Sequence, residues 1–454
     1  MDMREAIRTQ PMRPFQIWIV GICIALAMID GYEVVAMPFT IPHLARAWIL
    51  TSVETGYLLS SGIFGMAIGA IIISPLVDKM GRRRHILICL AMITLGMALS
   101  AAAQSVYQLV AVRTFAGLFI GAMISSLNIM VSEYSSEKRR GAVMGVYGVG
   151  LPLGSALAGL IIVELVAAYG WRAPFAFGAL LTAVMFVVVF MGLPESIEYV
   201  VEKRPRNALL IYNGIAVRLG FQPATSLPSP QSGRRGQMAW SEILTGITRL
   251  RTIFLWVSYA GVIASFYFAN TWTAKLISDA SGSPDLGIRA GMLIQFGGVA
   301  GALVFAALAV KVRPRLVTLL ILIMGAIAFA TYGRQVGNVE TALILAPFLG
   351  VFANGAVSAF YAISPSIYPT VNRGTGVGLM IGFGRFTAIL VPIGTGYMLT
   401  AGWTPAVLYQ FFGVVFAVSA IFGLLLDRTY RGRSENPETP EAMLEDTTLS
   451  ARAT

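Results

Sequence analysis

Charged residues are scarce in this chain of 454 residues. Only 12% of them are Asp, Glu, Lys or Arg, whereas 56% are hydrophobic, and the mean hydropathy is +0.74. A soluble protein of ordinary composition carries about 25% charged residues. This deficit excludes a soluble globular protein, and we expect an integral protein of the lipid bilayer.

Cysteine and histidine are also scarce, with two of each. Cys23 and Cys89 fall within apolar segments, where a cysteine is expected to be a small core residue, so neither a disulfide nor a metal site is predicted. His43 is expected on the extracellular side and His85 on the cytoplasmic side, so neither should be a buried proton relay. No Gly-x-Ser-x-Gly or His-Glu-x-x-His pattern occurs. We therefore expect no cofactor and no enzyme activity.

What the chain does contain is apolar segments of bilayer length. A spanning helix needs about 20 apolar residues, and we count twelve such segments. Residues 1–14 are polar and basic, and the first apolar run is too long for the core of a cleavable signal peptide. The sequence therefore predicts an all-α membrane protein with twelve transmembrane helices.

The net charge of +11 comes mainly from Lys and Arg in alternate loops between the apolar segments, such as residues 82–84, 138–140 and 428–433. By the positive-inside rule, these loops and both termini are expected to be cytoplasmic, in a bacterial inner membrane. The basic excess therefore sets the topology, and we expect no nucleic-acid partner.

Six apolar segments precede a polar region and six follow it. The expected parts are a cytoplasmic N-terminus (1–14), a six-helix bundle (15–193), a cytoplasmic linker (194–251), a second six-helix bundle (252–427) and a disordered cytoplasmic tail (428–454). A weak repeat supports this division, because Gly65-x-x-x-Gly69 in the first half matches Gly297-x-x-x-Gly301 in the second. Two six-helix halves related by parallel repetition are typical of the major facilitator fold.

Two acids, Asp30 and Glu33, lie one helical turn apart within the first apolar segment. A charge at the centre of a bilayer helix costs about 2.5–3.5 kcal/mol on insertion scales, and the three-residue spacing puts both carboxylates on one face. Two carboxylates this close in a low dielectric do not both ionise cheaply, so one is expected to hold a proton. The pair is a candidate proton-coupling site. In the structural alternative, Asp30 caps a helix end and Glu33 reaches the headgroups.

The loop from Ser74 to Arg84 resembles the loop 2–3 signature of the major facilitator superfamily, Gly-x-Leu-Ala-Asp-Arg-x-Gly-Arg-Arg. Gly81 permits a tight turn, and Asp78 can pair with cations of neighbouring loops and so latch one state. Val310 stands at the corresponding position of the second half, so the latch is asymmetric. The alternative is an ordinary basic loop that only sets topology. The expected conformational gate consists of Asp78, Gly81, Arg82, Arg83, Glu133 and Arg140.

Within this superfamily, the chain is similar to the aromatic acid:H⁺ symporter family over nearly its whole length. The similarity rests on four motifs: Asp30-Gly31-Tyr32-Glu33, where the family has Asp-Gly-aromatic-Asp; Asn270-Thr-Trp272-Thr; Pro365-Ser-x-Tyr368-Pro369; and Arg373-Gly-Thr-Gly-Val-Gly378 with Gly384-Arg385. Lys275 stands where many relatives have proline. The resemblance implies a monomer that takes up an aromatic carboxylate, of the benzoate or hydroxybenzoate kind, with protons and by alternating access.

An aromatic carboxylate needs a cation for its charge and flat apolar walls for its ring. Arg113 and Arg385 can each hold a carboxylate through two hydrogen bonds, although either can instead pair with a protein group. The other predicted substrate-binding residues are Tyr32, Asn270, Trp272, Tyr361 and Asn354. One alternative is a symporter or exporter of a non-aromatic solute, such as another organic anion, a sugar or a drug. Another is a membrane sensor that does not transport.

Overall fold

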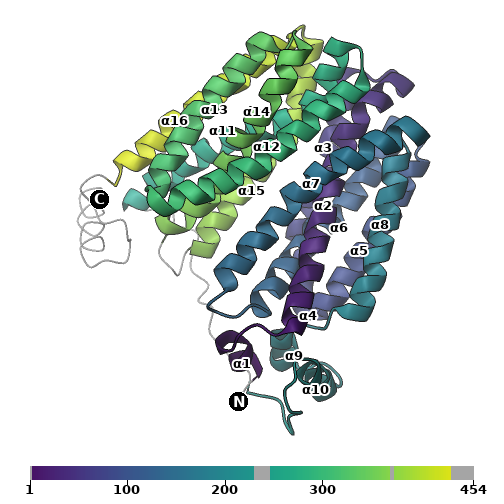
Figure 1. Cartoon of the computed structure of the whole chain (residues 1–454), viewed down its shortest axis with the longest axis vertical. Helices are drawn as coiled ribbons and strands as arrows, with labels where there is room; N and C mark the ends of the chain where they lie inside the picture. Colours follow the sequence, from purple (N-terminus) through teal and green to yellow (C-terminus); the bar gives the residue numbers. More distant parts are fainter. Residues whose placement is uncertain (1–2, 230–245, 369–372, 431–454) are drawn as a thin grey trace. The chain divides into compact units, whose positions relative to one another are not determined.

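The computed structural model describes residues 3–229, 246–368 and 373–430 (Figure 1). Pro369, the middle of the expected linker and the expected disordered tail beyond residue 430 lie outside this part. The described residues form helices joined by turns, with no strand among them. Twelve of the helical spans are long and apolar enough to cross a bilayer, as the sequence predicts.

The spanning helices are α2 (Pro14–Trp48), α3 (Ser52–Ile72), α5 (Arg82–Ala102), α6 (Val106–Glu133), α7 (Arg140–Tyr169), α8 (Ala173–Gly192), α11 (Gly246–Ser281), α12 (Pro284–Lys311), α13 (Pro314–Gln335), α14 (Val339–Ile363), α15 (Arg373–Thr400) and α16 (Pro405–Arg428). The shorter helices are α1 (Met3–Thr9), α4 (Val77–Met80), α9 (Ile197–Lys203) and α10 (Ala208–Arg218), with 3₁₀ turns at Ser74–Leu76 and Ser364–Ile367.

The chain divides into two compact units. Unit 1 comprises Met1–His43 and Ser61–Arg234, and unit 2 comprises Leu44–Ser60 and Arg235–Thr454. The boundary between residues 234 and 235 lies inside the expected linker. The segment Leu44–Ser60, which contains the end of α2 and the start of α3, groups with unit 2.

Glycines let the helices of unit 1 approach each other at backbone distance. A Cβ at Gly65 of α3 would collide with the backbone of Thr114 in α6, and a Cβ at Gly154 of α7 would collide with the backbone of Met28 in α2. Small residues at such crossings are how helices associate within a bilayer, where burial of apolar surface gives no drive.

Unit 2 repeats the first of these crossings. A Cβ at Gly297 of α12 would collide with the backbone of Pro347 in α14, and one at Gly301 would collide with Val351. The two matching Gly-x-x-x-Gly motifs therefore have the same structural role. Each lets the second helix of a half pack closely against the fourth.

The expected linker is partly helical, and together with the N-terminus it forms a cap on unit 1. We call α1, α9 and α10 the N-terminal cap; Figure 1 shows the three at the same end of unit 1 as the start of α2. Arg8 pairs with Glu198 at 3.1 Å, and Arg4 pairs with Glu202 at 3.4 Å. The backbone N–H of Met3 donates to the Tyr212 hydroxyl at 3.1 Å. The cap thus ties the chain start to the linker.

Candidate functional site

A charged cluster lies buried inside unit 1. Asp30, Glu33 and Arg113 are each no more than 3% exposed, although all three belong to bilayer-length helices. The Arg113 Nη1 atom lies 3.4 Å from Glu33 Oε2, and Nη2 donates to the Glu33 carbonyl at 3.0 Å. The sequence placed the two acids on one face of α2, and the structure brings Arg113 of α6 to Glu33.

The contacts of Arg113 define its role in this state of the molecule. Its guanidinium also lies 2.9 Å from Met97 Sδ and 5.6 Å from the ring centroid of Phe175. Oε1 of Glu33 accepts no hydrogen bond within the described residues, and it faces Gly178 of α8, which leaves room for it. Arg113 therefore neutralises Glu33, while its predicted contact with substrate stays a prediction.

Asp30 lies at the close crossing of α2 and α7. Next to it, Gly31 packs on the backbone of Leu151, and the Ser155 hydroxyl donates to the Gly31 carbonyl at 2.8 Å. The Tyr147 hydroxyl of α7 is within electrostatic range of the Asp30 carboxylate. Since the only cation in the cluster is bound to Glu33, the three groups together carry one net negative charge when both acids are ionised.

Unit 2 holds Arg385 in the middle of α15, beside tyrosine rings. Arg385 is half-buried and forms no hydrogen bond or ion pair within the described part of the chain. Its charge is within electrostatic range of Tyr259, whose ring packs against Gly384. The Tyr259 hydroxyl donates to that of Tyr361 at 3.3 Å, and the Tyr361 side chain is 48% exposed. A cation without a protein partner in a spanning helix is costly unless it serves a ligand or a pathway.

The other predicted substrate residues are packed against protein groups, and only some of them are hydrogen-bonded. Tyr32 is buried and donates to the Pro174 carbonyl at 2.7 Å. Trp272 is 1% exposed and donates through Nε1 to the Pro392 carbonyl at 3.2 Å. The Asn270 amide donates to Phe266, and its buried Oδ1 accepts no hydrogen bond among the described residues. The Asn354 amide faces Gly298 of α12. Their predicted roles in binding stay predictions.

The predicted gate residues largely come together at the basic end of unit 1. Arg82 Nη2 pairs with Asp78 at 3.1 Å, and Arg82 Nε lies 3.9 Å from Glu133 Oε1. The guanidinium of Arg83 donates to the Phe190 and Leu193 carbonyls, at 2.6 and 2.8 Å. The buried Nε atom of Arg140 forms no hydrogen bond within the described residues, so this atom does not join Arg140 to the group.

Glu195 organises this end of unit 1, and sequence reasoning assigned it no role. Its Oε1 accepts from the backbone N–H groups of Arg82 and Arg83, at 2.7 and 3.1 Å, and so caps the start of α5 from a distant loop. Gly81 has φ 93° and leaves the space that this carboxylate occupies. The neighbouring Ser196 donates to Glu133 at 2.5 Å. The only signal in the sequence is Leu193-Pro-Glu195-Ser196, which resembles a motif found after the sixth helix in the major facilitator superfamily.

Two further groups near this end are buried. The Tyr134 hydroxyl donates to the Glu195 carbonyl at 2.7 Å, and burial raises the pKa of Tyr134 well above its ordinary value, so the hydroxyl keeps its proton. His85 is 1% exposed and bonds through Nδ1 to Ser126 at 2.8 Å. His85 is therefore buried, contrary to expectation, because the first turn of α5 faces α6; its place on the cytoplasmic side stays a prediction.

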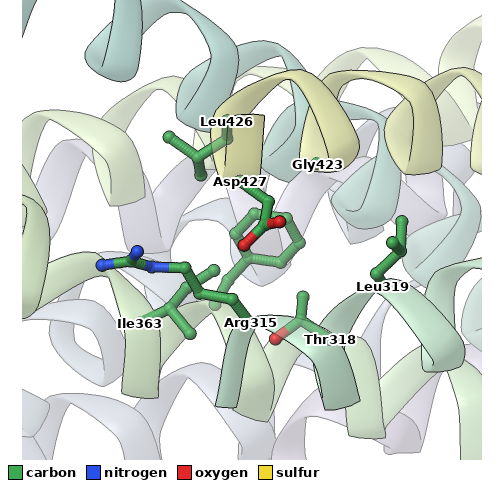
Figure 2. A pocket seen from close by; sticks show the side chains of 8 residues that line it. Arg315, Thr318, Leu319, Ile363, Gly423, Leu426 and Asp427 are labelled. Carbon is green, nitrogen blue, oxygen red and sulfur yellow. The ribbon is translucent and has the colours of Figure 1, made fainter. Parts of the chain in front are cut away.

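Unit 2 also has a small pocket between the ends of α13, α14 and α16. It is lined by Arg315, Thr318 and Asp427 among others. Figure 2 shows the Arg315 guanidinium pointing away from the Asp427 carboxylate, and Arg315 Cζ lies 3.3 Å from the ring centroid of Tyr430 instead. None of the predicted substrate residues lines this pocket.

Two units of bilayer-length helices, with charged groups held inside the spans, form the architecture of a secondary transporter. The sequence model of the Major Facilitator Superfamily matches residues 21–346 and 296–452. The chain therefore belongs to this superfamily and, within it, to the transporters of aromatic acids.

Individual relatives agree with this placement. The chain is 30% identical to the 4-hydroxybenzoate transporter PcaK of Pseudomonas aeruginosa, covering 89% of this chain and 90% of that protein. It is 27% identical to the gallate transporter of Pseudomonas putida, covering 91% and 92%. A bacterial homolog of the human lysosomal transporter Spinster, solved in an inward-facing and occupied conformation, superposes with a TM-score of 0.72 at 14% identity, covering 95% and 100%. The last of these shows the fold alone.

Proposed function

We propose that the protein is a proton-coupled symporter that takes up an aromatic carboxylate by alternating access. The proton site is Asp30 with Glu33 in unit 1, and the anion site is Arg385 with the Tyr259–Tyr361 pair in unit 2. One observation carries the proposal: Arg385 has no partner in the described chain, whereas Arg113 already neutralises Glu33. The relatives named for 4-hydroxybenzoate and gallate support an aromatic acid as the substrate class.

Charge balance explains why proton and anion travel together. In the empty protein, the cluster of unit 1 carries one net negative charge and Arg385 carries one positive charge, and each is costly inside a bilayer. A proton on Asp30 neutralises the first, and a bound carboxylate neutralises the second. The loaded protein therefore has no net charge at either site, which favours the conformational exchange when both ligands are present. In this proposal the transported proton binds at Asp30, while Arg113 stays paired with Glu33.

Arg385 and its neighbours fit the shape of the substrate. The planar guanidinium can hold a carboxylate through two hydrogen bonds. The Tyr361 ring, half-exposed beside Tyr259, offers a flat wall, and its hydroxyl can bond a hydroxyl group on the substrate ring. A neutral sugar would leave the charge of Arg385 unbalanced.

For the cell, we propose a monomer in a bacterial inner membrane with both termini cytoplasmic. The basic loops and the basic N-terminal cap support this orientation by the positive-inside rule. With protons entering down their gradient, the direction of transport is uptake.

The test is an uptake panel in proteoliposomes with an imposed pH gradient, acidic outside. Labelled benzoate, 4-hydroxybenzoate, gallate and a neutral sugar are compared in the same preparation. We expect accumulation of one or more aromatic acids and none of the sugar, and loss of accumulation when an ionophore collapses the gradient. Accumulation of the sugar, or aromatic-acid uptake that does not respond to the gradient, contradicts the proposal.

A further inference from the structure

The cap helix α10 is apolar on both of its faces. Its inner face buries Ala208, Tyr212 and Ile215, and Tyr212 contacts Met3 of α1. On the outer face, Leu210 is 75% and Val217 is 61% exposed. A helix with water on one side carries polar residues there. At 11 residues, α10 is about 16 Å long, too short to span a bilayer. The outer face of α10 is therefore poorly suited to contact with water, and the helix is too short to cross the bilayer.

The contacts of α10 place its C-terminal end where α2 begins. Arg13, one residue before α2, donates from its guanidinium to the Leu219 carbonyl. The Arg218 Cζ atom lies 5.6 Å from the ring centroid of Phe15, in the first turn of α2. In the next turn Trp18 is 54% exposed, and tryptophans at the ends of spanning helices sit at the level of the lipid headgroups. The end of α10 is thus at headgroup depth.

Basic side chains surround the exposed apolar face. Lys203, Arg204 and Arg206 precede the helix and Arg218 ends it, and no acid occurs between residues 203 and 229. The acids that come just before, Glu198 and Glu202, are paired with arginines of α1. The outer surface of α10 is therefore apolar in the middle and positive at both ends.

We propose that α10 is an interfacial helix that lies on the bilayer and binds anionic phospholipids. Leu210 and Val217 enter the boundary between headgroups and acyl chains, and the four basic side chains contact headgroup phosphates. An apolar face with Lys and Arg at its borders is the composition of helices that lie in the membrane plane, and basic clusters next to a spanning helix attract anionic lipid. The lipid is that of the bilayer in which the same chain is embedded, so the linker is held on the membrane beside unit 1.

The test uses a fluorophore whose emission depends on polarity, attached to cysteine in the Leu210→Cys variant. The native Cys23 and Cys89 are buried, so labelling favours the introduced thiol. The matched control is Glu5→Cys, an exposed position of α1 in the same cap. Each protein is reconstituted into vesicles of phosphatidylcholine alone or with phosphatidylglycerol, and iodide is present on both sides of the membrane.

With phosphatidylglycerol, we expect the label at position 210 to be blue-shifted and quenched several-fold less than the label at position 5. The protection should fall at high salt and in the Lys203→Gln/Arg206→Gln background, whose two side chains are exposed. Quenching equal to the control overturns the proposal, as does equal protection in phosphatidylcholine alone. Protection that grows with the protein-to-lipid ratio assigns the face to a second copy of the chain and also overturns it. No readout depends on transport, so the outcome is independent of the proposed function.

Discussion

In unit 1 the glycines of α3 meet the backbone of α6, and in unit 2 those of α12 meet α14 in the same way. The residues buried in the interiors of the two units differ. Unit 1 buries Asp30, Glu33 and Arg113 inside its spans. The interior of unit 2 holds hydroxyl contacts, such as Thr273 with Tyr409 at 2.6 Å, and its buried Arg251 lies near the start of α11.

The first and fifth helices of each half show the same contrast. In unit 1, Gly31 and Gly154 bring α2 and α7 into backbone contact. In unit 2, the ring of Tyr259 stands between α11 and Gly384 of α15, next to Arg385. The two halves thus share one pattern of helix crossings but enclose different groups, which fits the proposed proton site in unit 1 and the proposed anion site in unit 2.

The largest expected effect comes from removing the carboxylate of Asp30 in unit 1. Asp30→Asn should abolish pH-driven accumulation but retain exchange of labelled for unlabelled substrate, because the amide resembles the protonated acid. The assay is uptake and counterflow in the same proteoliposomes. The control is Asp279→Asn, an exposed acid of unit 2, which should accumulate normally. Full accumulation by the Asp30 variant would remove this residue from coupling.

The buried pair of unit 1 should also matter far more to stability than the exposed pair of unit 2. Arg113→Gln leaves Glu33 buried without its cation, which costs about 3–5 kcal/mol. Lys275→Gln breaks the surface pair with Asp279 in α11 and should cost about 0.3–0.5 kcal/mol. Thermal unfolding in detergent compares the two variants.

A double variant that removes both charges of the pair separates electrostatics from packing. The Glu33→Gln/Arg113→Gln double variant should recover most of the lost stability, because neither member of the pair is left charged without the other. If the double variant is as unstable as Arg113→Gln alone, the pair is not an electrostatic unit, and the contact of Arg113 with Met97 and Phe175 carries the effect.

Much of this architecture follows from the sequence. Hydropathy and length give the twelve spans, because a helix needs about 20 apolar residues to cross a bilayer. The glycine motifs predict close packing, and the acids of α2 stand out because charge inside a span is expensive. These are local patterns, which a single sequence displays directly.

The contacts that these charged residues make do not follow from the sequence. Nothing in the chain says that Arg113 meets Glu33 and that Arg385 stays without a protein partner, since both are arginines within apolar spans. Glu195 caps α5 across more than a hundred residues, and α10 was hidden in a stretch interpreted as a polar linker. Such pairings depend on how helices pack in space, which periodicity and composition do not encode.

A moderate effect, on binding alone, is expected in unit 2. Arg385→Lys keeps the charge but loses the planar fork, which costs one charge-assisted hydrogen bond, about 1.5–3 kcal/mol. The apparent KM for the carboxylate should therefore rise roughly 10- to 150-fold, with an unchanged melting temperature, because Arg385 has no protein partner within the described residues. Arg289→Lys, at an exposed position of α12, is the control. A lower melting temperature with normal uptake kinetics would instead make Arg385 a structural residue.

The smallest expected effect separates ring hydroxyl recognition from carboxylate binding. Tyr361→Phe removes one hydroxyl, half-exposed and bonded only to that of Tyr259 at 3.3 Å, and one neutral hydrogen bond contributes about 0.5–1.5 kcal/mol. If this hydroxyl bonds the substrate ring, KM for 4-hydroxybenzoate should rise roughly 2- to 12-fold, while KM for benzoate should not change. Tyr169→Phe, at an exposed site of unit 1, should leave both constants as they are. An equal rise for both substrates would mean that Tyr361 acts through its ring or through Arg385, and the ring hydroxyl would then have to be recognised by another polar group of unit 2, such as Asn270.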